Sequence, residues 1–377
     1  MKNANTKSRV SSVSKLRARL LKSWAAVSVL AASLLFIGLL TGCPHNQPSA
    51  VDQPPAKPLD PAAILNTNGY GKITGYKCAK EELPAHLVIP AKIGDEEIKE
   101  ISSWAFYNCT GLRSISLPAR IIKIGGYAFS GCTGLTSITL PASLTTIGQD
   151  AFSGCTGITS LTIDSANATY KTEGNILYNK AGTTLIFAAG GLTSATIPDT
   201  VTTIGKNAFA YCTGLTSVHL PASITKIESG AFSGCTGITS LTIDSANAKY
   251  KTEENILYSK DGTILIFAAG GLTSATIPDT VTTIDDRAFF GCTGLTSVHL
   301  PARITRIYGS AFEGCTGLTS AVFADTNGWK VYDSILYSSY TSKSIDSIYL
   351  ENAATAAKYL REKTDKGGYC DKYWKKR

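Results

Sequence analysis

Cysteine is the residue type whose number and spacing in this chain first suggest chemistry. The 377 residues include ten cysteines, and in a secreted protein that number predicts a disulfide framework. Seven of them recur in one short word, A-F-x-x-C, as Cys109, Cys132, Cys155, Cys212, Cys235, Cys292 and Cys315. A cysteine that recurs at the same position of every repeat unit is typically a small buried core residue. A bridge between neighbours such as Cys109 and Cys132 is possible but not expected, and Cys78 and Cys370 lie too far apart to pair.

Histidine and the oxygen-bearing residues offer a second route to chemistry. His219 and His299 take the same outward strand position several coils apart, about 14–19 Å away from each other, so one zinc ion cannot bridge them. Asp164, Asn167 and Glu173 form an oxygen-rich loop without EF-hand spacing, so we expect a surface turn there and in its copy at Asp244, Asn247 and Glu253. The sequence contains no H-E-x-x-H, G-x-S-x-G, P-loop or dinucleotide motif. We therefore expect no enzyme activity, no metal site and no cofactor.

The word A-F-x-x-C opens a unit that repeats at a regular interval. The step from Cys109 to Cys132, and again to Cys155, is about 23 residues, and residues 128–150 read AFSGCTGLTSITLPASLTTIGQD; this length and spacing of Leu and Ile indicate a leucine-rich-repeat solenoid. The alternation over 136–140 predicts a short strand that Pro141 ends. The side chains predicted to point inward are Ala128, Phe129, Cys132, Leu135, Ile138, Leu140, Leu144 and Ile147. One coil cannot bury them alone, so ten stacked coils, with a degenerate first unit at 83–104, should form one parallel sheet of about 45–50 Å.

Two coils carry an insertion, at residues 164–190 and 244–270. The pair Asp261-Gly262 between two apolar runs predicts a β-hairpin in the second insertion. Each insertion is expected to replace the A-F-x-x-C part of the following coil. The stretch 151–178 returns as 231–258 with only two differences, which indicates duplication of a longer module that runs from Ala151 to Gly230.

The N-terminal residues predict export and an anchor. Residues 1–24 carry seven basic and no acidic side chains, an apolar run follows, and Leu-Thr-Gly-Cys ends at Cys43. This ending resembles a bacterial lipobox, which implies a signal peptide at 1–42 and lipid attachment at Cys43. An ordinary signal peptide or an uncleaved anchor would be the alternative. Without the signal, the formal charge falls from +8 to about 8 − 7 = +1, which leaves no basic surplus for nucleic acid.

The remaining chain divides into a tether, a solenoid and a cap. Six prolines at 44–61 predict an extended tether over 43–62, without helix or strand. The solenoid is assigned to 63–350, with 70–76 closing its first end. The cap is assigned to 351–377 and contains a short helix over 351–363, with Asn352 as its expected N-cap. Near the C-terminus, the residues expected to pack on the last coil are Tyr369, Tyr373 and Trp374.

Two surfaces are candidates for binding a partner. The first is the outward face of the strands, which includes Ser137, Thr139, Ser160, Thr162, Ser217, His219, Ser240, Thr242, Ser297 and His299. Solenoids use such faces for extended contacts, although threonine is also simply favoured on exposed strands. The second is formed by hairpin tyrosines, which either anchor an interface or pack the hairpins: Tyr170, Tyr178, Tyr250 and Tyr258.

The repeat word and the hairpin word I-L-Y-x-K-x-G resemble the treponemal-type leucine-rich repeats of BspA-like bacterial surface proteins. The resemblance covers about residues 70–340. It implies a cell-surface adhesin, on the outer membrane, that binds host matrix or plasma proteins or other bacteria. We expect a lipid-anchored, monomeric protein with a protein partner. The alternative is an envelope scaffold that faces the periplasm and binds a bacterial partner.

Overall fold

The computed structural model describes residues 60–333 and 342–376. The predicted signal peptide, Cys43, nearly all of the tether and the hairpin expected from Ser334 lie outside these residues. In the described part, none of the helices is long and apolar enough to cross a membrane.

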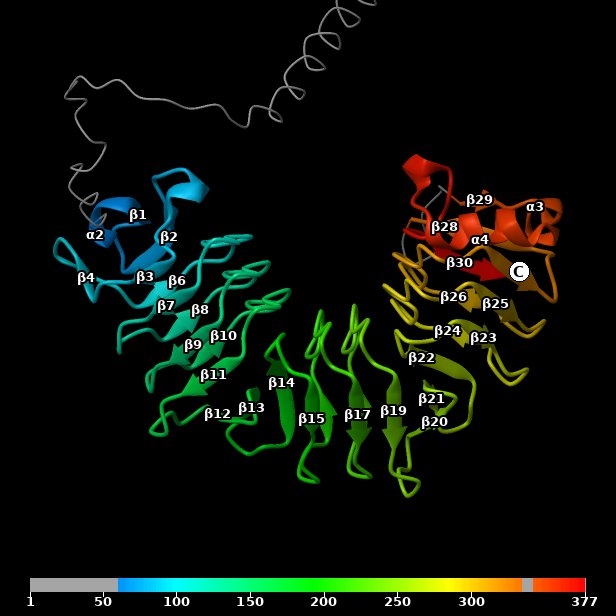
Figure 1. Ribbon diagram of the computed structural model, residues 1–377, viewed down its shortest axis with the longest axis horizontal. Helices are drawn as coiled ribbons and strands as arrows, with labels where there is room; N and C mark the ends of the chain where they lie inside the picture. The colour runs from blue at the N-terminus through cyan, green and yellow to red at the C-terminus, as the bar shows by residue number, and fades with distance from the viewer. Residues whose placement is uncertain (1–59, 334–341, 377) are drawn as a thin grey trace, which may run out of the picture. The chain divides into compact units, whose positions relative to one another are not determined.

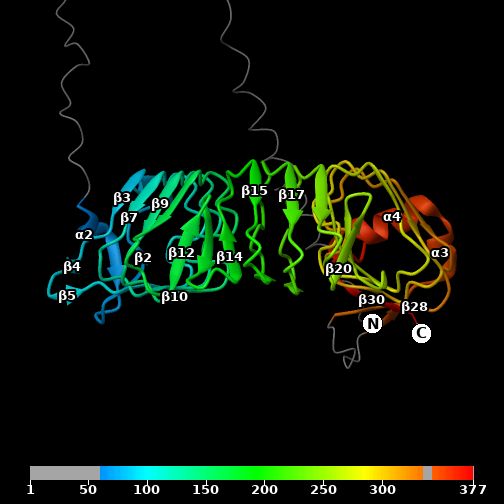
Figure 2. The same cartoon turned by 90° about the horizontal axis from the view of Figure 1, so that it is seen from below.

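Each coil contributes one strand to a long face and one shorter strand to a second row. In the coil that begins at Ala128, the face strand is β9 (Ser137–Leu140) and the short strand is β10 (Thr146–Ile147). The predicted inward side chains are buried, except that Ile147 is half-buried. Figure 2 shows the two rows along the repeat region. The leucine-rich-repeat solenoid of about ten coils is confirmed.

The ten face strands of the described part form three parallel sheets rather than the single sheet that the sequence predicted. Neighbouring strands within a sheet pair equivalent positions of successive coils, as in Ser160 beside Ser137. The first sheet contains β3 (His86–Val88), β7 (Ser114–Ser116), β9 and β11 (Ser160–Ile163). The second contains β15 (Ser194–Thr196), β17 (Ser217–Leu220) and β19 (Ser240–Ile243). The third contains β23 (Ser274–Thr276), β25 (Ser297–Leu300) and β27 (Ser320–Phe323).

The two insertions cause the breaks between these sheets, which we call the first and second seams. Each insertion folds as three antiparallel strands, and its last strand continues into the row of short strands. At the first seam the strands are β12 (Tyr170–Glu173), β13 (Ile176–Asn179) and β14 (Thr184–Ala188). At the second they are β20 (Tyr250–Glu253), β21 (Ile256–Ser259) and β22 (Ile264–Ala268). The hairpin predicted at Asp261-Gly262 is confirmed, with Gly262 at a φ of 73°.

The remaining short strands complete the second row. Before the first insertion, β6 and β8 continue the row of β10 in parallel pairs, and after each insertion the short strands follow its last strand in parallel, as in β14 beside β16. Their bounds are β6 (Glu100–Ile101), β8 (Lys123–Ile124), β16 (Thr203–Ile204), β18 (Lys226–Ile227), β24 (Thr283–Ile284) and β26 (Arg306–Ile307).

At each seam an asparagine takes the place of a strand partner. The backbone N–H of Leu161 in β11 donates to Oδ1 of Asn175 at 2.9 Å, and Leu241 donates to Asn255 in the same way at 2.9 Å. These asparagines stand in a tight turn with a positive φ of 60° each, a conformation that asparagine tolerates better than most residues. The ladder of the face sheet therefore stops at the seam without leaving this N–H unpaired.

Asn167 is buried, so the surface turn predicted for the oxygen-rich loop is wrong at its centre. The Asn167 side chain donates to the carbonyls of Pro141, Ala142 and Leu144 at 3.0, 3.1 and 2.8 Å. Its Oδ1 accepts the N–H groups of Thr169 and Tyr170, both at 2.8 Å. Asn247 repeats this arrangement in the second copy. Each asparagine ties an insertion to the preceding coil.

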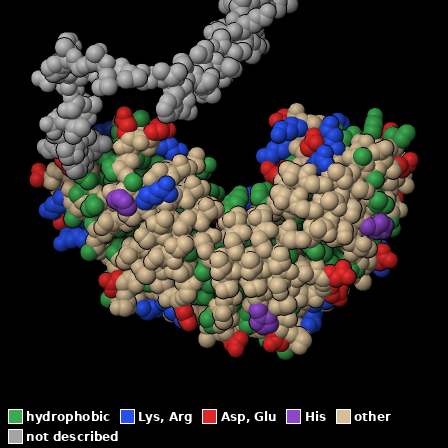
Figure 3. Space-filling model, in the orientation of Figure 1, with side chains coloured by type: hydrophobic (Ala, Val, Ile, Leu, Met, Phe, Trp, Pro, Cys, Tyr) green, Lys and Arg blue, Asp and Glu red, His purple; other side chains and the backbone are tan. Residues whose placement is uncertain are grey.

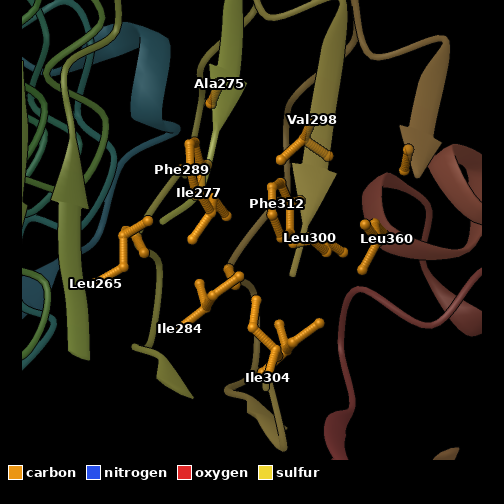
Figure 4. Packing of buried hydrophobic residues seen from close by; sticks show 14 of the residues in the cluster. Leu265, Ala275, Ile277, Ile284, Phe289, Val298, Leu300, Ile304, Phe312 and Leu360 are labelled. Carbon is orange, nitrogen blue, oxygen red and sulfur yellow. The ribbon is translucent and has the colours of Figure 1, made fainter. Parts of the chain in front are cut away.

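The core is a stack of equivalent side chains from successive coils. Ring centroids lie 5.4 Å apart between Phe106 and Phe129, and 5.5 Å between Phe129 and Phe152. Phe187 of the first insertion continues this column at 5.5 Å, which agrees with the prediction that the insertion replaces the A-F-x-x-C segment. Figure 4 shows the same packing near the C-terminus, where Phe289 and Phe312 lie side by side. Burial of each large apolar side chain stabilises the stack by about 1.5–3 kcal/mol.

The seven periodic cysteines are free, buried thiols. Sγ of Cys132 donates to the carbonyl of Phe106 in the preceding coil at 3.1 Å, and Cys155 donates to Phe129 at 3.0 Å. Burial raises the pKa of Cys212 to about 12, so this thiol stays protonated at neutral pH. The thiols therefore act as small core groups that also pair a carbonyl, because a reactive cysteine needs its thiolate form.

The repeat region curves because its inner edge is shorter than its strand face. The A-F-x-x-C turns form this inner edge. Oδ1 of Asp150 accepts a hydrogen bond from Nδ2 of Asn207 at 2.7 Å, so the turns that begin at Ala151 and Ala208 are in contact. Their face strands β11 and β17 are nevertheless separated by β15. Described by itself, the repeat region forms an arc with these turns on the inside (Figure 1).

The N-terminal end is closed by added strands. The helix α2 (Pro61–Ile64) begins at Asp60 with proline in its first turn, which such a position favours; the prediction of no helix over 43–62 is therefore wrong at its end. β1 (Leu65–Thr67) pairs with β2 (Lys72–Tyr76), which lies within the predicted closing segment. A 3₁₀ turn and a small hairpin complete this end: η1 (Lys80–Glu82), β4 (Lys92–Ile93) and β5 (Glu96–Glu97).

The C-terminal end is closed by helices and by a returning strand. The predicted helix is α4 (Ala353–Arg361), and Asn352 caps it by accepting the N–H of Thr355 at 2.9 Å. Trp374 is buried, as expected, in β30 (Tyr373–Lys376), which pairs with β26 and with β28 (Trp329–Tyr332). The other elements of this end are β29 (Lys343–Ser344), α3 (Ser347–Glu351) and η2 (Thr364–Lys366).

Replacement of Asn167 by alanine should destabilise the protein by about 2–4 kcal/mol, because each buried group left unpaired costs about 1–3 kcal/mol. Urea unfolding measures this change. The matched control is Thr169→Lys, which introduces the residue that the second copy carries at Lys249. Equal stability of the two variants would show that the Asn167 hydrogen bonds do not hold the insertion.

Stability should fall as the pH rises above about 8.5, where an unfolded thiol ionises. The pKa of Cys212 is raised in the folded state to about 12. Its contribution is therefore complete below about pH 8.5 and is lost progressively toward pH 12. Urea midpoints measured from about pH 8 to about pH 10.5 should decline less steeply in Cys212→Ala than in the parent. Identical slopes would contradict this origin.

Candidate functional site

The predicted strand-face residues lie on the exposed side of the three sheets. Ser137 and Ser297 are half-buried, and the other predicted positions are exposed: Thr139, Ser160, Thr162, Ser217, His219, Ser240, Thr242 and His299. Across the described face strands, none of the outward positions carries Lys, Arg, Asp or Glu. Figure 3 shows charged side chains mainly at the margins and ends of the arc. This strand face is thus a long uncharged surface rich in hydroxyl groups.

Some neighbouring polar side chains on the strand face hydrogen-bond to one another. The hydroxyl oxygens of Thr139 and Thr162 lie 3.0 Å apart. Nδ1 of His219 lies 3.0 Å from Oγ1 of Thr242. Such pairs stabilise a sheet by roughly 0.2–1 kcal/mol, so these residues have a structural role whether or not they bind a partner.

The hairpin tyrosines differ in burial, since Tyr178 and Tyr258 are buried while Tyr170 and Tyr250 are half-buried. Tyr178 and Tyr258 are only 1 % and 2 % exposed, so the prediction that they are hairpin contacts is wrong. Tyr170 is half-buried, and its hydroxyl accepts the N–H of Ile147 at 3.3 Å; Tyr250 makes the equivalent contact with Ile227 at 3.1 Å. Tyr178 and Tyr258 lie in strands whose first three residues are all buried.

The inner edge carries a second set of side chains that the sequence analysis did not single out. The residue before each A-F word adopts a positive φ, for example 65° at Trp104, 55° at Asp150 and 54° at Asn207. This conformation is unusual for residues other than glycine. It places one residue from each turn on the inner edge, and all of these except Gly230 carry a side chain.

These inner-edge positions differ among repeats that are otherwise nearly identical. The stretches 151–207 and 231–287 differ at eight positions, and three of the eight are the consecutive positions 205–207. The three residues before the seven A-F words read SSW, GGY, GQD, GKN, ESG, DDR and YGS. A comparison of the repeats with one another would therefore have found this edge from the sequence. The core and the strand face repeat, while the inner edge does not.

The first seam forms a pocket because the inserted coil lacks an A-F-x-x-C turn. The Asp150–Asn207 hydrogen bond crosses this gap. On one side lies a hollow of about 420 Å³ whose lining includes Trp104, Tyr127 and Tyr211. On the other lies a hollow of about 380 Å³ against Phe187 and the neighbouring insertion residues. We call the hollow that Trp104 lines the first-seam pocket.

At the second seam, different residues at the variable inner-edge positions leave less space beside the insertion. The equivalents of Asp150 and Asn207 there are Gly230 and Arg287, one module later in the chain. The hollow on the Phe267 side of this seam, equivalent to the one against Phe187, shrinks to about 20 Å³. Since the insertions themselves are nearly identical, the difference in space follows from the side chains before the A-F words.

An aromatic stack forms one wall of the first-seam pocket. The rings of Trp104 and Tyr127 are 4.3 Å apart and nearly parallel, at 13°, and Tyr107 meets Trp104 edge-on at 4.8 Å. Trp104 remains 53 % exposed. Partial burial, and then a hydrogen bond with Asp150, raise the pKa of Tyr127. The ring of Tyr127 is thus neutral, and its hydroxyl can donate within the Asp150 network.

Iodide should quench the fluorescence of Trp104 selectively. Trp329 and Trp374 are 2 % and 1 % exposed, so a dissolved anion reaches neither ring. We expect Trp104→Phe to abolish most of the quenching in protein from which the signal segment has been removed, as measured by Stern–Volmer titration. Quenching that survives this substitution would show that the pocket wall is closed or that the cap is open.

Among residues 60–333 and 342–376, no three His, Cys, Asp or Glu side chains are grouped as metal ligands would be. The candidate site comprises two surfaces: the uncharged strand face and the variable, partly aromatic inner edge.

The repeats of this chain are similar to those of known bacterial proteins. A family model described as the BspA type leucine rich repeat region matches six copies, over residues 92–180, 184–260 and 265–360. Similar solved structures include a leucine-rich cell surface protein of Faecalibacterium prausnitzii, at 23 % identity over 70 % of this chain and 93 % of that chain, with a TM-score of 0.36. They also include the leucine-rich repeat protein of T. pallidum, at 24 % identity over 66 % of this chain and 82 % of that chain, with a TM-score of 0.28. The pneumococcal vaccine antigen PcpA is 21 % identical over 68 % of this chain and 66 % of that chain, with a TM-score of 0.36.

No match was found among curated protein sequences. The family model nevertheless covers more than half of the 377 residues, and most of the matched residues lie in the coils described above. The chain belongs to the BspA-type leucine-rich repeat family.

Proposed function

We propose that this chain is a lipid-anchored cell-surface protein that binds protein partners, as its family and its lipobox together imply. Lipid attachment is assigned to Cys43, and the proline-rich segment after it would hold the solenoid away from the membrane. The partners that the family suggests are host matrix or plasma proteins, or other bacteria. The protein acts as a monomer and has no catalytic role in this proposal.

The observation that carries the proposal is the uncharged strand face. Its outward rows repeat in the same register along each sheet, as with His219 beside Thr242 and Ser217 beside Ser240. A partner with a repeated surface of its own can bind several such rows at once. Weak contacts of this kind gain strength by avidity. The absence of charge on the face favours adaptable polar contacts rather than long-range electrostatic attraction.

Protease treatment of intact cells tests the location. An antibody to the C-terminal residues should lose its signal while a periplasmic control protein survives. Survival of the signal until lysis would contradict surface exposure and would favour the alternative, a periplasm-facing scaffold with a bacterial partner.

Deletion of residues 151–230 tests the binding mode. It removes one complete module and joins Asp150 to Ala231, whose following residues are the same as those after Ala151. We expect cooperative unfolding to persist and binding to immobilised plasma and matrix proteins to weaken by at least about tenfold. Unchanged affinity would contradict multivalent binding by the strand face.

A further inference from the structure

We propose that the first-seam pocket binds a saccharide, with a pyranose ring stacked on the exposed ring of Trp104 and its hydroxyl groups bound by polar side chains across the seam. The proposal concerns the inner edge and is independent of protein binding by the strand face.

The size and lining of the pocket fit a small polar ligand better than a protein anchor. Its volume of about 420 Å³ lies within the range of small-molecule sites. The floor is made of small residues with hydroxyl groups, among them Ser130, Ser153 and Ser233. A large apolar anchor from a protein would leave these hydroxyls without water or a partner, which is unfavourable. A sugar ring instead offers C–H bonds on one face and hydroxyl groups around its rim.

The aromatic wall supplies the surface for the C–H face of the ring. One face of the Trp104 ring stacks on Tyr127. Trp104 belongs to the first of the A-F turns, so no earlier turn of this kind covers its other face. Tyr107 and Tyr211 extend the exposed aromatic surface, at 47 % and 40 % exposure. Aromatic rings held in this way by their neighbours lose little freedom when a ligand stacks on them.

The polar side of the pocket has hydrogen-bonding capacity for hydroxyl groups. Asp150 accepts from Asn207 at 2.7 Å and from Gln149 at 3.0 Å, which fixes its carboxylate while further lone pairs stay available. Among the described residues, Oδ1 of Asn207 is the buried side-chain acceptor that lacks a hydrogen-bond partner. It lies over Gly230, close to the guanidinium of Arg287. A ligand hydroxyl that displaces Arg287 would give it a donor.

The second seam provides a natural contrast within the same molecule. It has the same insertion and the same backbone, but Gly230 and Arg287 stand where the first seam has Asp150 and Asn207. The carboxylate and amide that would hold a sugar are absent there. The inferred site is therefore specific to the first seam.

Saturation-transfer NMR with lactose and cellobiose on the purified full-length protein tests the proposal. We expect transfer to the C–H protons of one ring face at millimolar sugar, and a shift of Trp fluorescence on titration. Trp104→Ala should weaken binding by about tenfold. Tyr349→Ala, an exposed ring on α3, is the matched control and should leave binding unchanged.

The double substitution Asp150→Gly with Asn207→Arg gives the first seam the residues of the second. Because the second seam folds with these residues, the variant should fold and should lose transfer from both sugars. Transfer that persists in it, or no transfer to the parent protein from either sugar at millimolar concentration, would overturn the proposal. Binding of immobilised proteins that depends on Trp104 while neither sugar binds would also overturn it, and would assign the pocket to a protein partner.

Discussion

A single coil of the solenoid cannot bury its own apolar side chains, and this constraint determines the rest of the molecule. Phe129 is covered only because Phe106 lies on one side and Phe152 on the other. The same stacking lets Cys132 pair a carbonyl of the coil before it. Every core position must therefore repeat, which leaves only positions outside the stack free to vary. The solenoid separates a fixed interior from a changeable surface.

The insertions are tolerated because they satisfy this constraint in a different way. Phe187 continues the aromatic column, Asn175 takes the place of a lost strand partner, and Asn167 fastens the loop to the preceding coil. What the insertion omits is the turn on the inner edge. The omission brings Asp150 and Asn207 together, bends the stack and opens a pocket. One local change in sequence thus produces both the curvature and the candidate ligand site.

The features that depend on the repeat period or on local patterns could be predicted from the sequence. The face strands, the buried thiols, the hairpin at Gly262 and the helix cap at Asn352 all depend on local patterns, and each was predicted. The break in the sheet was missed because strand pairing across an insertion is not visible in either strand alone. The burial of Asn167 was missed because its carbonyl partners belong to the preceding coil. The first-seam pocket depends on Asp150 and Asn207, which stand in different repeats, so local patterns could not predict it.

Small-angle X-ray scattering from a variant that lacks the first seam tests most directly whether the missing inner turn bends the solenoid. In this variant, residues 164–207 are replaced by residues 141–150 followed by residues 128–150, which keeps the number of coils and restores the omitted turn. Cooperative urea unfolding would confirm that it is folded. If the missing turn bends the stack, the folded variant is a straighter particle with a larger maximum dimension than the parent. An unchanged scattering curve from the folded variant would contradict this explanation of the bend.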